Sequence, residues 1–221
     1  MFIGRDVVTT FDLATTDELL STTRAVRKRL DMDRLVERSV ITDCIGLSQQ
    51  APTGSNKQGW RWVVVTDAEK RRVIADYCRK GVGDYLFTAK AAAEERGAGQ
   101  DVRVFESAQF LADRMQDAPV HIIPCIEAGH IAADAPRRAW IGLGGSIFPA
   151  IWSFQLALRA RGLGSCLTTL HLSYENEVSE LLGIPDSMLQ IALLPVAYTK
   201  GTDFKTAKRP PADEIIHWEQ W

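Results

Sequence analysis

The chain has 221 residues, of which 46% are hydrophobic and 24% charged, a composition that allows a sizeable core in one large or two small domains. Lysine and arginine total 26 and the acids 28, so the net charge of -2 gives no field that would favour nucleic acid or an anionic membrane. Four scattered cysteines form no CxxC pair, and we expect reduced thiols and no metal site. The N-terminal residues carry acids and lack a signal-peptide pattern, which favours a cytoplasmic location.

The first half of the chain alternates helical patterns with one buried strand. A short helix is expected over residues 16–21, and a second within residues 32–51, where apolar residues recur at helical spacing. Residues 62–66 predict a strand, and Asp67 is a good N-cap for the next helix. Residues 80–118 are polar, interrupted by glycines and partly helical, and are expected to form a lid over a site.

A strand and an apolar helix follow. Residues 120–126 predict a strand that Pro124 ties to a bend or a sheet edge. Residues 139–158 carry no charge and are long enough to span a bilayer. Because three glycines interrupt the start of this stretch, we expect helix only over residues 146–161, buried in a core or a subunit interface.

The last quarter returns to short elements. Residues 162–164 end the apolar helix, residues 175–182 predict a helix, and residues 190–198 predict a strand. Residues 200–221 are basic, then proline-rich, and end in an apolar, strand-like piece. Helices outnumber strands, so the pattern indicates a mixed α+β fold.

Hydrolase and nucleotide-binding signatures are missing from the sequence. There is no GxSxG, no cysteine with an evident histidine partner and no Walker A loop, and the glycines at 142–145 lack the Rossmann spacing. Anion-binding chemistry is instead present near the N-terminus. Arg24 and Arg27 stand three apart and are expected to share one face of a helical turn, where guanidinium groups suit a phosphate; a solvated basic helix is the alternative.

Two further polar patches lie far from this one. The loop at residues 51–60 offers hydroxyls and amides but no acid, which suits the edge of a neutral heteroaromatic ring, although a plain turn is the alternative. The C-terminal tail places Lys205, Lys208 and Arg209 before two prolines. The apolar residues that follow, Ile215, Ile216, Trp218 and Trp221, indicate a tail that docks onto another surface.

Taken in order, these patches resemble the motifs of the nitroreductase family of FMN-dependent oxidoreductases. The resemblance rests on four stretches: the basic residues 23–27, the loop 51–60, the Gly-Leu-Gly-Ser of residues 162–165, and Lys208-Arg209-Pro210 with His217-Trp218. It implies a single nitroreductase-like domain with a mostly antiparallel sheet flanked by helices. It also implies an intertwined homodimer with two FMN sites at the interface and the tail wrapped around the partner.

The resemblance assigns roles to particular residues. Arg24, Lys208 and Arg209 are expected at the FMN phosphate, and Arg27 near the flavin N1 and O2, where reduction places negative charge. Pro52, Thr53, Gly54 and Asn56 would reach the flavin from the other subunit, and Thr168, Thr169 and Leu170 would face its N5 and O4 edge through their main chain. Thr23 and Ala25 replace the commoner Arg and Ser, so FMN retention is expected to be weaker, with the Ala25 N–H still serving.

The resemblance implies hydride transfer from NADPH or NADH through flavin N5 to nitroaromatics, quinones or similar acceptors, without a side-chain acid or base. Tyr85, Phe105 and Phe110 would complete the acceptor stack, or else pack the lid. Three alternatives stay open: another flavin reaction such as reductive deiodination or flavin cleavage, a flavin-binding protein without turnover, and a plain α+β domain.

Overall fold

The structure is a computed structural model that describes residues 11–132 and 134–221. Its contacts divide the chain into two units: residues Arg24–Thr202 form the larger, and the residues up to Thr23 together with Asp203–Trp221 form the smaller. The larger unit contains the sheet and nearly all of the helices.

An antiparallel sheet forms the centre of the larger unit. Its strand order is β1-β2-β5-β3, and β4 pairs with β2 beside β5. The strands span Trp60–Val65 (β1), Val120–Glu127 (β2), Leu163–Ser165 (β3), Met188–Gln190 (β4) and Leu194–Tyr198 (β5). The predicted α+β class with an antiparallel sheet is therefore confirmed.

Pro124 was expected to mark a bend or a sheet edge; it lies in the central strand, so the edge was wrong. β2 has β1 on one side and both β4 and β5 on the other. The Pro124 carbonyl accepts from the Ile191 N–H at 3.0 Å, and the nitrogen of an antiparallel residue faces the same side as its carbonyl. The missing N–H therefore faces the gap between β4 and β5, where the strand predicted over residues 190–198 divides in two.

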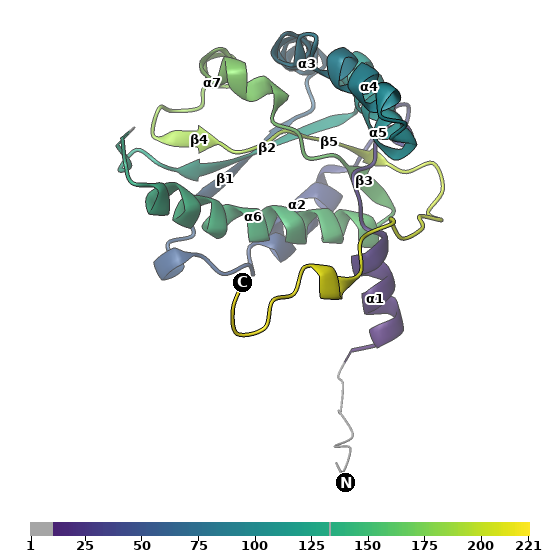
Figure 1. Cartoon of the computed structure of the whole chain (residues 1–221). Coiled ribbons are helices and arrows are strands. Elements are labelled where there is room, and N and C mark those ends of the chain that lie inside the picture. Colours follow the sequence, from purple (N-terminus) through teal and green to yellow (C-terminus); the bar gives the residue numbers. More distant parts are fainter. Residues whose placement is uncertain (1–10, 133) are drawn as a thin grey trace. The chain divides into compact units, whose positions relative to one another are not determined.

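Helices cover both faces of this sheet (Figure 1). One face carries α2 (Arg38–Ser48) and α6 (Arg137–Ala160), and the other carries α3 (Ala68–Val82), the 3-10 turn η3 (Leu170–Tyr174) and α7 (Glu175–Leu182). The predicted lid is a pair of packed helices, α4 (Tyr85–Glu95) and α5 (Gly99–Arg114). The prediction of helix 175–182 is confirmed, as is the Asp67 cap of α3, whose carboxylate accepts from the Lys70 N–H at 2.8 Å.

Helix α6 is longer than the sequence predicted, because it runs unbroken through its glycines from Arg137. Its buried side chains recur every three or four residues and join the main core, namely Leu143, Ile147, Ile151, Phe154 and Leu158. This burial outweighs the weak helix propensity of the glycines. By length and composition alone α6 could cross a membrane, but its stripe of sheet-facing residues is typical of a core helix. Its other side leaves Trp140, Ile141, Phe148 and Trp152 exposed.

One other helix boundary differs from the sequence prediction. Helix α2 begins at Arg38, several residues later than its apolar pattern indicates. The residues before it are tied to β5, because the Asp31 N–H donates to the Tyr198 carbonyl at 2.8 Å and the Arg34 guanidinium stacks on the Tyr198 ring.

In the smaller unit, α1 (Leu13–Thr22) contains the predicted short helix and is capped by Asp12. The end of the C-terminal tail forms no strand; it contains the 3-10 turn η4 (Ala212–Glu214), and the apolar side chains after that turn are exposed. The strand-like reading of this piece was therefore wrong.

Candidate functional site

The basic segment at residues 24–29 is not helical: residues 24–27 have no regular structure, and residues 28–29 form a turn. Helix α1 ends at Thr22, and the Val26 N–H donates to the Ser165 carbonyl of β3 at 2.9 Å. Because the segment is not helical, Arg24 and Arg27 do not share the helical face that the sequence predicted. Tertiary pairing with β3 overrides the local spacing. Arg24 is exposed and Arg27 is half-buried.

Gly164 explains how the basic segment comes this close to β3. A Cβ atom added to Gly164 would lie 2.9 Å from the Val26 Cβ and 2.8 Å from the Thr199 Cγ2, both too short for a real contact. The second glycine of Gly-Leu-Gly-Ser is therefore a packing requirement of the basic segment. The sequence alone indicated a helix end and a family motif at these glycines, but not this packing contact.

The Arg27 side chain contacts both Ser107 of α5 and Cys166, the residue after β3. Its Nη1 donates to the Ser107 hydroxyl of α5 at 3.3 Å. The thiol of Cys166 is buried; burial raises the pKa of this thiol, and the charge of Arg27 opposes that rise. A fixed positive charge therefore stands next to the turn that leads to Thr168. Neither Ser107 nor Cys166 had a sequence signal for this contact.

Thr168, Thr169 and Leu170 continue directly from that turn. Both main-chain groups of Thr168 pair with Leu193, at 2.9 and 2.8 Å. The Leu170 carbonyl touches α3, because a Cβ atom added to Gly81 would lie 2.0 Å from its oxygen. Among the described residues the Thr169 N–H has no protein acceptor, so it is the main-chain donor that this segment can offer to a ligand.

A buried histidine, His171, lies immediately after these residues and was not predicted. Burial lowers the pKa of His171 to about 4, and the nearby Gln190 side chain only partly opposes this. His121 of β2 interacts electrostatically with it and is fully buried; burial lowers its pKa to about 4, although its Nε2 contacts the Met115 carbonyl at 2.8 Å. Both side chains are therefore neutral at pH 7.

The loop at residues 51–60 contacts other helices and strands than Arg27 does. It contacts α6 and the end of β2, whereas Arg27 contacts the end of β3 and α5. Pro52, Gly54 and Asn56 are exposed and Thr53 is half-buried. Together with Ile126, Leu143 and neighbouring residues the loop lines a cavity of about 430 Å³, at which Lys57, Glu127 and His130 are the charged or titratable groups.

The predicted lid residues differ in their surroundings. The rings of Tyr85 and Phe105 meet edge to face, with their centres 6.4 Å apart, and Tyr85 is largely exposed. Phe105 packs with Leu170 against a small apolar cluster of α3, α4 and α5, which places the lid against the Thr168–Leu170 turn. Phe110 lines a cavity of about 340 Å³ together with Lys28, and Phe105 borders the same cavity.

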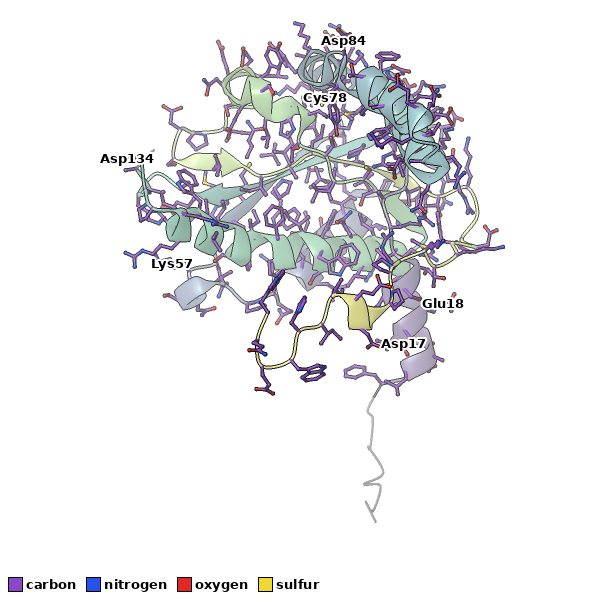
Figure 2. The ribbon with its side chains drawn as sticks, viewed as in Figure 1. Asp17, Glu18, Lys57, Cys78, Asp84 and Asp134 are labelled. Atoms are coloured by element: carbon purple, nitrogen blue, oxygen red, sulfur yellow. The ribbon has the colours of Figure 1, made fainter. Side chains whose placement is uncertain are left out.

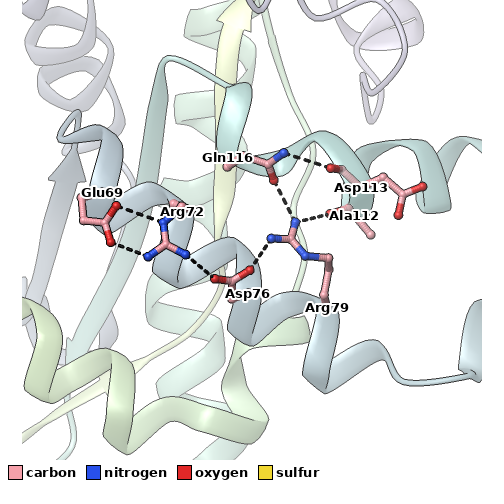
Figure 3. Close-up of polar contacts among 7 residues, drawn as sticks. All are labelled: Glu69, Arg72, Asp76, Arg79, Ala112, Asp113 and Gln116. Carbon is pink, nitrogen blue, oxygen red and sulfur yellow. Dashed lines mark hydrogen bonds and ion pairs between the residues drawn. The ribbon is translucent and has the colours of Figure 1, made fainter.

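Polar contacts attach the lid to α3 at the C-terminal end of α5 (Figure 3). Arg79 donates to the Ala112 carbonyl at 3.1 Å and to the Gln116 side chain at 2.8 Å, and Asp76 receives both Arg79 and Arg72. These contacts are concentrated at one end of α5. They fix the C-terminal end of α5 to α3, the helix that covers the sheet.

Lys208 and Arg209 belong to the smaller unit. Both side chains are exposed, and the Arg209 guanidinium donates to the Lys208 carbonyl at 3.2 Å.

The fold and these motifs define a class of protein, and a family model gives it a name. The model of the nitroreductase family matches residues 20–198, so the chain belongs to this family.

Solved structures agree on the fold across nearly the whole chain. A BluB-like flavoprotein from Clostridium difficile 630 has a TM-score of 0.68 at 21% identity, covering 93% of this chain and 99% of that chain. A variant of the FMN and NADPH-dependent nitroreductase NfnB from sphigopyxis sp. strain HMH has a TM-score of 0.65 at 23% identity, with the same coverages. An oxidized iodotyrosine deiodinase bound to FMN and 3-iodo-L-tyrosine has a TM-score of 0.65 at 21% identity, again covering 93% and 99%.

Proposed function

We propose that this protein is an FMN-dependent oxidoreductase that transfers hydride from NADPH or NADH to a nitroaromatic, quinone or similar acceptor. The observation that carries the proposal is the pairing of the basic segment with β3 through Val26 and Ser165. This pairing joins the segment that carries Arg24 and Arg27 to the end of β3, from which the chain continues to Thr168, although some 140 residues separate the two motifs.

The residues present fit FMN. The exposed side chain of Arg24 carries a charge that suits a phosphate, and the Ala25 main chain adds a donor. Lys208 and Arg209 are proposed as further phosphate contacts from the family resemblance alone. The half-buried guanidinium of Arg27 suits a ring edge that gains negative charge. The Thr169 N–H, which has no protein acceptor among the described residues, offers a further main-chain donor. Bound FMN would supply the acceptance and release of hydride at its N5 atom.

The remaining contacts would come from a second copy of the chain. Pro52, Thr53, Gly54 and Asn56 lie on the α6 side of the fold, and the Gly54 N–H donates directly to Ser146 of that helix. The neighbouring α6 surface exposes two tryptophans, Trp140 and Trp152, with Ile141 and Phe148 between them. An aromatic patch of this kind favours a homodimer in which the loop of one protomer completes the site of the other.

The chain is proposed to act as a single domain over residues 1–221, in the cytoplasm. Residues 200–221 would wrap the partner, since Ile215, Trp218 and Trp221 leave large apolar side chains exposed. Residues 80–118 would cover the flavin and exclude water, with Phe105 packed beside Leu170. Tyr85, Phe105 and Phe110 are proposed to contact the acceptor. No side-chain acid or base is needed, because solvent can supply the protons.

The first test is the visible absorbance spectrum of the purified protein, read before and after anaerobic addition of NADPH and then NADH. A yellow protein that bleaches supports the proposal and names the donor. A yellow protein that neither nicotinamide bleaches favours a binding role or another donor. A colourless protein that FMN cannot reconstitute contradicts the flavin assignment.

The acceptor requires a separate test once reduction is seen. Reduced protein mixed with a quinone, a nitroaromatic or 3-iodotyrosine is expected to reoxidise fastest with one of the first two. Preferential reaction with the iodotyrosine, or loss of the flavin itself under oxygen, would replace the proposed reaction by one of its alternatives.

The role of Arg27 is tested by Arg27→Ala and Arg27→Lys, with Arg96→Ala as a matched removal of an exposed arginine elsewhere. A charge-assisted hydrogen bond contributes about 1.5 to 3 kcal/mol, so Arg27→Ala is expected to weaken FMN binding by about 10- to 100-fold. Arg27→Lys is expected to have an FMN affinity between those of wild type and Arg27→Ala. Equal FMN affinity in Arg27→Ala and Arg96→Ala would contradict a contact between Arg27 and FMN.

A further inference from the structure

The loop at residues 53–58 has an unfavourable backbone. Ser55, Asn56 and Gln58 have φ angles of 53°, 53° and 49°, in the left-handed region. Among the described non-glycine residues, only Glu219 shares this feature. Asn tolerates this conformation, but for Ser and Gln it is strained. Such strain persists only where surrounding contacts impose the shape.

Two contacts within the loop contribute to that shape. The Gln58 N–H donates to the Thr53 hydroxyl at 3.2 Å, and the Gln58 side-chain amide donates to the Asn56 Oδ1 at 2.9 Å. Both contacts join residues of the loop to each other, so neither fixes the loop to the rest of the fold.

The anchor outside the loop is Ser146 of α6. Its hydroxyl accepts from the Gly54 N–H at 3.1 Å and donates to the Gly142 carbonyl of its own helix at 2.9 Å. Donating within the helix leaves the oxygen lone pairs directed at the loop. The approach is close, because a Cβ atom added to Gly54 would lie 3.3 Å from the Ser146 Oγ.

We propose that Ser146 is a positioning residue that holds the loop 53–58 in its strained shape, ready for the flavin contacts of Pro52, Thr53, Gly54 and Asn56. The inference rests on the proposed function, since it takes FMN as the ligand of this loop. With Ser146 in place the loop is ordered before the ligand arrives, and binding does not have to order it. Without Ser146 the left-handed residues relax, and FMN must restore them.

The first experiment measures loop order in the protein without FMN. Lys57 is an exposed tryptic site inside the loop (Figure 2). Full-length wild type, Ser146→Ala, Ser146→Thr and Ser153→Ala are digested with limited trypsin, and cleavage after Lys57 is followed by mass spectrometry. Ser146→Ala is expected to cleave there several-fold faster. Ser146→Thr, which keeps the hydroxyl, and Ser153→Ala, which removes one further along α6, are expected to match wild type.

The second experiment measures FMN affinity of the same four proteins by fluorescence titration. The loss of one neutral hydrogen bond corresponds to about a 3- to 10-fold weaker dissociation constant for Ser146→Ala, with recovery in Ser146→Thr. Equal affinity in Ser146→Ala and Ser153→Ala would overturn the positioning role. Unchanged trypsin cleavage in Ser146→Ala would overturn the anchoring of the loop.

The two experiments separate this inference from the function on which it rests. If wild type binds no FMN, the proposed function fails, while the trypsin comparison still reports whether Ser146 orders the loop. If FMN binds and only the trypsin rate responds to Ser146→Ala, the flavin role of the loop is overturned and the cofactor assignment stands.

Discussion

Two regions of the larger unit present short polar groups to a proposed ligand, and they do so by different means. The Thr168–Leu170 turn is held by the two main-chain hydrogen bonds between Thr168 and Leu193 and by close packing: its carbonyl at Leu170 contacts Gly81, and the basic segment beside it contacts Gly164. The loop 53–58 is held by hydrogen bonds against an unfavourable backbone. Packing leaves no room for added atoms, whereas hydrogen bonds can be deleted singly. Substitutions should therefore destabilise the first region and loosen the second.

The largest expected effect is a loss of folding stability in acid, which arises from two buried histidines. His121 and His171 have pKa values of about 4 in the folded protein against an ordinary value of 6.5. The folded state therefore binds fewer protons than the unfolded chain between these values. The contribution of the two neutral histidines to the free energy of unfolding is fully present above pH 6.5. It is lost as the pH falls, by about 3 kcal/mol per histidine at pH 4. Urea unfolding at pH 7.5, 6 and 5 measures it.

Carboxylates also titrate in acid, so a variant is needed to isolate the histidines. His171→Leu keeps a similar volume and removes one titrating group, and its stability should fall less steeply between pH 7.5 and 5. His171→Gln serves the same purpose if the leucine variant does not fold. Identical slopes in wild type and both variants would show that His171 does not contribute.

The next effect is expected from Gly81→Ala. The added methyl group would lie 2.0 Å from the main-chain oxygen of Leu170, and that oxygen can move only if η3 moves away from α3. We expect a loss of about 3 kcal/mol in the free energy of unfolding. Gly46→Ala is the matched control, since nothing lies within 4 Å of its added Cβ, and it should gain up to about 1 kcal/mol. Equal stability of the two variants would contradict the close contact.

The same contrast explains what the sequence could predict. Segments whose own residues determine the structure were found: the strand before Asp67, the Asp67 cap and the helix 175–182. The motifs that resemble the family were also found, because their residue types carry the chemistry. The number of strands was not predicted, because the break between β4 and β5 depends on Pro124, which lies in the distant strand β2.

Errors arose wherever a tertiary contact overrode a local pattern. The basic segment was expected to be helical, but Val26 pairs with Ser165. Helix α6 was expected to begin at Ser146, but the burial of Leu143 and the residues after it extends it through the glycines. The contacts of Arg27 with Ser107 and of Gly54 with Ser146 join residues some 80 and 90 positions apart, and neither pair has a spacing that marks it.

A moderate effect is expected from Gly164→Ala, which tests the link between packing and the cofactor. Its Cβ would meet the side chains of Val26 and Thr199 at 2.8 to 2.9 Å, and these can shift more readily than a main-chain atom. We expect a loss of about 1 to 2 kcal/mol of stability and displacement of the basic segment. FMN titration should therefore show weaker binding in Gly164→Ala and none of this loss in Gly46→Ala. Destabilisation with full FMN affinity would separate the packing of this segment from the site.

The smallest effect measures the backbone strain of the loop directly, by comparing Gln58→Gly with Gln58→Ala. Both variants remove the amide contact with Asn56, and both keep the main-chain N–H that bonds Thr53. Only glycine adopts a φ of 49° without strain, but it also gains freedom in the unfolded chain. If the strain is real, Gln58→Gly should be more stable than Gln58→Ala by about 0.5 to 1 kcal/mol in urea unfolding. A less stable glycine variant would mean that the loop carries no strain for Ser146 to maintain, and the hydrogen bonds would then reinforce a shape that the chain already prefers.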